Sequence, residues 1–168
     1  SGIDPIDIAS LLPKLRGASG RLEAVALGQK FAAFVDYAHS PDAVARVLET
    51  ARELSKGRVI GVLGCGGDRD RSKRSAMGRA LDRGSDLAIF TSDNPRSESA
   101  DEILKEMTDG IESASVISDR AEAIRSAVNE AGDGDVVIIL GKGHETGQDI
   151  AGVMHSFDDR IELAKAIE

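Results

Sequence analysis

Four short segments of this 168-residue chain carry residue types that bind small charged molecules. They are residues 36–41 (DYAHSP), 64–70 (GCGGDRD), 93–96 (DNPR) and 141–145 (GKGHE). Arginine grips a carboxylate or phosphate in a bidentate fork, and glycine lets the backbone approach a ligand closely. These segments therefore predict a site for a small anionic molecule.

Three common catalytic motifs are incomplete in these segments. A dinucleotide fingerprint would need a third glycine where Arg69 stands, and residues 141–143 lack the first glycine and the hydroxyl of a phosphate-binding P-loop. A zinc-protease motif would need a second histidine where Gln148 stands. The chain's three histidines also lack the spacing of a metal-ligand set, so we expect no metal site.

Several residues of these segments have two interpretations. Asp36 could accept a hydrogen bond from a ribose hydroxyl, or could be a charge at the start of the next helix. Tyr37 could pack on a nucleobase, although core filling is the commoner role of a lone tyrosine. Glu145 could accept hydrogen bonds from an ammonium group or cap a turn. The sequence leaves these alternatives open.

The basic residues at 69–74 contrast with the chain as a whole, which has 21 basic and 29 acidic side chains and a net charge of -8. This acidic balance argues against a general nucleic-acid binder. A local positive patch suits a small anion, and Pro95 could aim Arg96 into the same crevice. A solvated loop is the alternative interpretation. We also expect Lys73 or Arg74 to face the phosphates of a nucleotide.

The single cysteine, Cys65, excludes an internal disulfide and fits a cytoplasmic protein. Its arginine-rich segment should lower the pKa of the thiol. However, no neighbouring histidine marks it as a nucleophile, so we interpret it as a small packing residue. The longest uninterrupted apolar run, residues 136–140, is far shorter than the roughly 20 residues of a membrane span, and no secretory leader is visible.

Each of the four segments follows a predicted strand. Strands are expected at residues 22–27, 31–37, 58–64, 86–91, 116–117 and 135–140, with a hairpin extension at 150–154. Helices are expected from 41 to a stop at 57, and at 75–83, 100–111, 120–131 and 158–167. The first two strands form an N-terminal β-hairpin around residues 28–30.

This alternation predicts one Rossmann-like α/β domain, with a mostly parallel sheet and helices on both faces. Ligands bind at the carboxyl ends of such strands, so the four segments should converge there. We expect residues 1–20 to be a linker and residues 21–168 to form the domain.

Together with residues 20–23 (GRLE), the four segments resemble in order the C-terminal domain of the Mur ligase family. The 93–96 segment resembles that of the members that add diaminopimelate. The resemblance implies an ATP-dependent amide ligase that joins meso-diaminopimelate to UDP-N-acetylmuramoyl-L-alanyl-D-glutamate in peptidoglycan synthesis. The acceptor carboxylate would be phosphorylated to an acyl phosphate, and the amine of diaminopimelate would then displace phosphate.

The resemblance also implies roles for individual residues. The nucleotide would contact Arg21, Asp36, Tyr37 and His39. Diaminopimelate would bind Arg69, Asp93, Asn94, Arg96, Gly141 and Glu145. Arg96 would pair with the distal carboxylate that distinguishes diaminopimelate from lysine.

The family's P-loop, carbamylated lysine and magnesium ligands are expected before residue 1, in a central domain that would bind most of ATP and Mg²⁺. We therefore expect no catalytic residue and no activity in this chain alone. Alternatives are a Mur-like ligase of the folylpolyglutamate or cyanophycin synthetase type, which would lack Arg96, or a non-catalytic small-molecule binding module. A nicotinamide oxidoreductase is disfavoured by Arg69 at the third glycine position.

Overall fold

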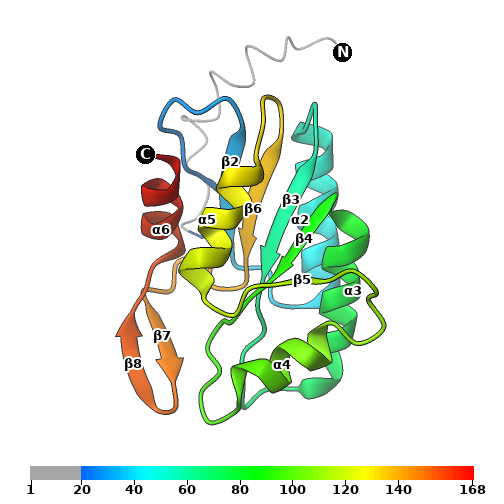
Figure 1. The fold of residues 1–168 in the computed structure, drawn as a ribbon, viewed down its shortest axis with the longest axis vertical. Helices are drawn as coiled ribbons and strands as arrows, with labels where there is room; N and C mark the ends of the chain where they lie inside the picture. Colours follow the sequence, from blue (N-terminus) through cyan, green and yellow to red (C-terminus); the bar gives the residue numbers. More distant parts are fainter. Residues whose placement is uncertain (1–19) are drawn as a thin grey trace.

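The computed structural model describes residues 20–168, which form a six-stranded sheet with helices on both faces (Figure 1). The strands are β1 (Glu23–Ala24), β2 (Ala32–Asp36), β3 (Val59–Leu63), β4 (Leu87–Phe90), β5 (Ser115–Val116), β6 (Val136–Leu140), β7 (Gly147–Ile150) and β8 (Val153–Ser156). The helices are α2 (Pro41–Leu54), the short 3₁₀ turn η2 (Arg71–Lys73), α3 (Arg74–Gly84), α4 (Ala100–Met107), α5 (Arg120–Glu130) and α6 (Asp159–Ile167).

The main sheet has the strand order β1-β2-β6-β3-β4-β5, in which β1 is antiparallel to β2 and the other neighbours are parallel. The predicted fold class, including the N-terminal hairpin, is therefore confirmed. The expected linker at residues 1–20 lies, apart from Gly20, outside the described residues, and the domain boundary stays a prediction.

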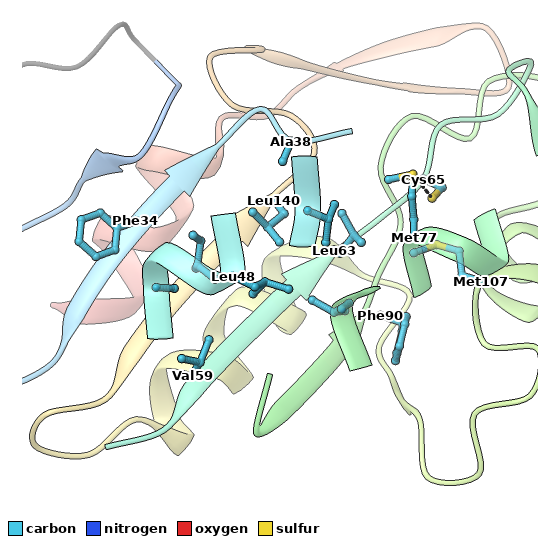
Figure 2. Close-up of a cluster of buried hydrophobic side chains, with 14 of the residues drawn as sticks. Phe34, Ala38, Leu48, Val59, Leu63, Cys65, Met77, Phe90, Met107 and Leu140 are labelled. Atoms are coloured by element: carbon cyan, nitrogen blue, oxygen red, sulfur yellow. Dashed lines mark hydrogen bonds between the residues drawn. The ribbon is translucent and has the colours of Figure 1, made fainter. Parts of the chain in front are cut away.

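Alternating side chains of the central strands enter two separate hydrophobic cores. Phe34 and Leu63 point to the face covered by α2, α3 and α4 (Figure 2), whereas Val35 and Val62 point to the face covered by α5 and α6. Since both faces are covered, β3 and β6 are buried along their whole length and are apolar without interruption. This continuous apolar pattern is why the sequence indicated them as strands.

The helix boundaries follow local capping signals. The Ser40 hydroxyl accepts a hydrogen bond from the Ala43 N–H at 3.3 Å, and Pro41 is the first residue of α2, as predicted. Helix α4 ends at Met107, earlier than expected, because Thr108–Gly110 form a turn in which Gly110 has a φ of +79°.

The second hairpin differs from the prediction. The segment expected to pair at 150–154 is only the tip of a longer hairpin, in which β7 and β8 form their own two-stranded sheet instead of extending the main one. Ala151 and Gly152 make its turn with φ values of +52° and +79°. Non-glycine residues rarely adopt such angles, so Ala151 is not a residue type that predicts a turn.

A buried ion pair joins the last two helices to the strand ends. The guanidinium of Arg120, at the start of α5, contacts Asp159, at the start of α6, at 2.7 Å, and both side chains are 0% exposed. Arg120 also donates to the carbonyl oxygens of Leu140 at 2.9 Å and Ser92 at 3.2 Å. It therefore fixes the points at which segments 93–96 and 141–145 begin.

Replacing Arg120→Ala should lower the free energy of unfolding by about 3–5 kcal/mol, because it leaves the Asp159 carboxylate buried without its cation. Urea unfolding followed by circular dichroism measures this effect. Arg125→Ala, an exposed position on the same helix, is the matched control and should change stability by less than about 0.5 kcal/mol. Equal unfolding midpoints for the two variants would contradict the assignment.

Candidate functional site

A cavity of about 280 Å³ lies at the carboxyl ends of the parallel strands, where the four segments meet. This volume is near the lower end of the range for small-molecule sites, about 300–1,000 Å³. Its lining includes most of the residues predicted for the site: Tyr37, His39, Arg69, Asp93, Asn94, Arg96, Gly141 and Glu145. Of the predicted site residues, Arg21 and Asp36 do not line the cavity. All four segments contribute residues to its lining, so their predicted convergence is confirmed.

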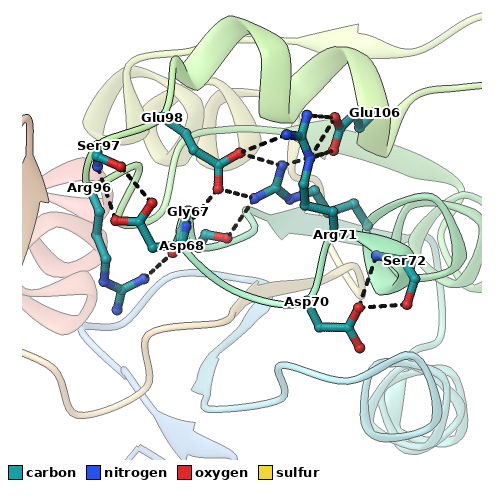
Figure 3. A network of polar contacts seen from close by, with 11 residues as sticks. Gly67, Asp68, Asp70, Arg71, Ser72, Arg96, Ser97, Glu98 and Glu106 are labelled. Carbon is teal, nitrogen blue, oxygen red and sulfur yellow. Dashed lines mark hydrogen bonds and ion pairs between the residues drawn. The ribbon is translucent and has the colours of Figure 1, made fainter.

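Two guanidinium groups face this cavity. One nitrogen of Arg96, Nη1, donates to the carbonyl oxygen of Gly67 at 2.7 Å (Figure 3). The exposed Arg69 side chain makes no hydrogen bond or ion pair with any residue of the described range 20–168. Because a guanidinium carries five N–H donors, both arginines keep donors for an anionic ligand.

The segments that carry these arginines are packed tightly together. The Gly67 N–H donates to the carbonyl oxygen of Asn94 at 2.8 Å, and a Cβ atom at Gly67 would collide with the carbonyl oxygen of Pro95. Only glycine allows the two backbones to come this close. Gly67 thereby sets the distance between the Arg69 and Arg96 segments.

A buried lysine holds the side chains of two residues that line the cavity, Asn94 and Glu145. Lys142 is 0% exposed, and its Nζ donates to Asn94 Oδ1 at 3.0 Å and to Glu145 Oε2 at 3.3 Å. Asn94 Nδ2 donates to the same Glu145 oxygen at 2.9 Å. Glu145 Oε1 accepts no hydrogen bond within residues 20–168, which leaves it available to a ligand ammonium.

The sequence analysis missed the role of Lys142, which it treated only as part of an incomplete P-loop. Lys142 stands two residues after the end of a strand that is apolar and buried along its whole length, so its backbone starts from a buried position. This placement was a usable signal, but one of its two hydrogen-bond partners, Asn94, lies in another loop, 48 residues away in the chain.

Asp93 places a second carboxylate in the cavity. Its side chain is 10% exposed, its nearest cation is Lys142 Nζ at 4.0 Å, and its carboxylate accepts no hydrogen bond from the described part of the chain. Burial raises the pKa of this carboxyl above its usual range, although Arg120 and Lys142 act in the opposite direction. An incoming ammonium group would supply the donor that this carboxylate lacks.

The expected positive patch is largely neutralised. Arg74 is 2% exposed, and it forms ion pairs with Glu98 at 2.7 Å and Glu106 at 2.8 Å, while Arg71 also pairs with Glu106 (Figure 3). Hydrogen bonds from Arg74 lower the pKa of Glu98 to about 2. Arg74 and the exposed Lys73 both line the cavity, and the expectation that one of them faces a phosphate stays a prediction.

Asp36 ties two loops together. Its carboxylate oxygens accept the N–H groups of Leu22 at 2.8 Å and Ala38 at 2.7 Å, and the residue is 5% exposed. It therefore holds the segment that contains Arg21, whose exposed side chain makes no hydrogen bond or ion pair within residues 20–168. The ribose contacts expected of Asp36 and Arg21 stay predictions.

Tyr37 does not fill the core, contrary to the interpretation favoured from its residue type. Its half-buried ring lies against the exposed rings of His39 and His144, with centroid distances of 4.7 and 5.4 Å. The strand ends before this residue, so its side chain lies at the rim of the cavity and not between sheet and helix. His144 was not predicted as part of this group.

Cys65 is a packing residue, as predicted, but its pKa shifts in the opposite direction. Burial and the charge of Asp93 raise the pKa of the thiol to about 12, and Arg74 opposes them only in part. Its sulfur lies 3.7 Å from that of Met77 (Figure 2). The expected lowering of the thiol pKa fails because burial disfavours the thiolate more than the charge of Arg74 favours it.

Within residues 20–168, no three histidine, cysteine or acidic side chains are grouped so as to hold a metal ion. No helix of this part of the chain combines the length and apolar character needed to cross a bilayer.

A family model described as "Mur ligase, glutamate ligase domain" matches residues 20–143. The chain belongs to the Mur ligase family. The match includes every segment that lines the cavity except the last residues of 141–145, and it ends before the β7–β8 hairpin.

The relatives of this Mur ligase domain include proteins named UDP-N-acetylmuramoyl-L-alanyl-D-glutamate--2,6-diaminopimelate ligase. Those of Streptomyces coelicolor and Syntrophomonas wolfei are both 49% identical and cover 100% and 99% of this chain. A solved structure of the same name is 43% identical over 99% of this chain, with a TM-score of 0.84. The chain spans only 35% of the length of each of these relatives.

A folylpolyglutamate synthase/dihydrofolate synthase from Yersinia pestis is similar over 76% of this Mur ligase domain, with 23% identity and a TM-score of 0.59. That likeness shows a shared fold.

The raised pKa of Cys65 predicts a protected thiol. At pH 8 the folded chain should react with iodoacetamide at least about a hundredfold more slowly than the chain in urea, because the reactive thiolate is suppressed by burial. Mass spectrometry of the alkylated chain measures both rates. Similar rates in the two conditions would show that Cys65 is accessible and ionised in the folded state.

Proposed function

We propose that this chain is the amino-acid-binding domain of a cytoplasmic, ATP-dependent ligase that adds meso-diaminopimelate to UDP-N-acetylmuramoyl-L-alanyl-D-glutamate. One observation carries the proposal: a guanidinium, Arg96, and two carboxylates, Asp93 and Glu145, face the same small cavity. This arrangement complements an amino acid, which presents a carboxylate and an ammonium group. The 49% identity to diaminopimelate ligases over the whole chain supports the same reading.

Arg96 supplies the proposed selectivity. Diaminopimelate carries a second carboxylate at the end where lysine has only an ammonium group. The free donors of Arg96, joined by those of Arg69, would pair with that carboxylate, and Glu145 Oε1 would accept the adjacent ammonium. A bound lysine would leave the guanidinium without its partner, which can discriminate by up to roughly 10⁴-fold.

ATP would supply the phosphoryl group that activates the acceptor carboxylate, with Mg²⁺ neutralising its phosphates. In this chain, exposed Arg21 and the Tyr37–His39 rings at the rim fit contacts to a nucleotide's sugar and base. The cavity has no P-loop, so the phosphates and Mg²⁺ would be held mainly by a preceding domain. This chain's task is to bind the amino acid and present its amine.

Arg96→Ala in the full-length ligase should raise the KM for diaminopimelate by about 10–100-fold, because a charged hydrogen-bonding partner of the substrate is lost. It should also remove the preference for diaminopimelate over lysine and leave the KM for ATP unchanged. Phosphate release measured with each amino acid checks this. Arg46→Ala, at an exposed position of helix α2, is the control. A wild-type enzyme that uses lysine and diaminopimelate equally would refute the proposed substrate.

The 168-residue chain by itself should release no phosphate from ATP when it is supplied with UDP-N-acetylmuramoyl-L-alanyl-D-glutamate, diaminopimelate and Mg²⁺. A malachite-green assay detects the phosphate, with the full-length ligase as positive control. Turnover above background by the isolated chain would show that it contains a complete catalytic site.

A further inference from the structure

The β7–β8 hairpin projects from the main body of the domain (Figure 1). Strand β8 is exposed along its whole length, including Val153 at 57% and Met154 at 68%. The base of the hairpin is closed by a hydrogen bond from the Phe157 N–H to the carbonyl oxygen of Thr146. The hairpin contributes little to either hydrophobic core, so core packing does not explain its presence.

The inner strand of the hairpin instead holds the backbone of Arg96. The Arg96 N–H donates to the carbonyl oxygen of Asp149 at 3.0 Å, and the Ala151 N–H donates to the carbonyl oxygen of Arg96 at 2.8 Å. Arg96 has a φ of +52°, a left-handed conformation that non-glycine residues adopt only when their surroundings impose it. These two hydrogen bonds impose it here.

Hairpin residues also hold the two residues that precede Pro95. Gln148, which is 8% exposed, donates through Nε2 to the carbonyl oxygen of Asp93 at 2.8 Å. The Asp149 N–H donates to Asn94 Oδ1 at 3.0 Å. The hairpin is therefore bonded to Asp93, Asn94 and Arg96, which all line the cavity.

The part of the chain that follows residue 143, which comprises the hairpin and helix α6, lies outside the match to the family model. The family model ends at residue 143, before β7 begins, whereas the relatives named as diaminopimelate ligases cover 99–100% of the chain. The hairpin thus lies outside the segment matched to the family as a whole and inside the segment shared with the diaminopimelate ligases.

We propose that the β7–β8 hairpin is a specificity determinant, and that Gln148 is a positioning residue that orients Arg96 toward the distal carboxylate of the amino acid. Gln148 holds the start of the 93–96 segment, and the backbone of residues 149–151 holds its end. Within residues 20–168 the guanidinium of Arg96 makes one hydrogen bond, to the carbonyl oxygen of Gly67, and its other donors are left for a ligand in the cavity. The inference rests on the proposed function.

Three variants test this role. Gln148→Ala removes one side-chain tie, and a truncation that replaces residues 148–155 with a two-residue Asn-Gly turn removes all of them, since Gly147 and Ser156 are already paired. His155→Ala is the matched control, because His155 is the exposed cross-strand neighbour of Gln148. Amide hydrogen exchange at Arg96 is measured in the 168-residue chain, and kinetics are measured in the full-length ligase.

In both test variants, Arg96 amide exchange should be faster, and the KM for diaminopimelate should rise, by about tenfold for Gln148→Ala. The ratio of kcat/KM for diaminopimelate to that for lysine should fall, while the KM for ATP and the kcat at saturating diaminopimelate stay within twofold. His155→Ala should behave as wild type. An unchanged ratio in Gln148→Ala and in the folded truncation would overturn the inference while leaving the proposed function intact. A wild-type enzyme without the preference would overturn both.

Discussion

The Arg120–Asp159 ion pair is the interaction on which the geometry of the site depends. Both side chains are fully buried, which costs the hydration free energy of two charges. The hydrogen bonds that Arg120 donates to the carbonyl oxygens of Ser92 and Leu140 help to offset this cost. Through these contacts the start of α5, the start of α6 and the ends of β4 and β6 meet at one point. The segments that carry Asn94 and Glu145 therefore leave the sheet from fixed positions.

The charge of the site is set by local pairing and not by the acidic average of the chain. Glu98 and Glu106 neutralise Arg74 and Arg71, while Lys142 offsets the carboxylate of Glu145 from below. What remains for a ligand is a small set of unpaired groups of both signs around one cavity. A net charge of -8 is thus compatible with a pocket for a zwitterion, because the distances within the pocket are shorter than the screening length of about 8–10 Å.

Two of the segments at the cavity contain a non-glycine residue in the left-handed conformation, Asp68 with a φ of +53° and Arg96 with a φ of +52°. The left-handed Arg96 and the close approach of Gly67 to Pro95 would be unfavourable in an isolated loop. Here the 93–96 segment is held by hydrogen bonds both to the 64–70 segment and to the β7–β8 hairpin. A residue held from both sides loses little further conformational entropy when a ligand binds, which favours affinity and discrimination together.

The sequence by itself determined the α/β class, the order of strands and helices, and the meeting of four segments at one sheet edge. Those features follow from apolar periodicity and capping residues such as Ser40, which act over a few neighbouring positions. The sequence also marked Arg69, Asn94, Arg96 and Glu145 through a resemblance of ordered motifs. Only the tertiary structure decided that the side chains of Arg74 and Lys142 are buried in ion pairs, that Tyr37 lies at the rim of the cavity, and that Gln148 holds the 93–96 segment. Each of those outcomes depends on a partner 24 to 55 residues away in the chain, or on where a strand ends against its neighbours, and local pattern carries no information about such pairings.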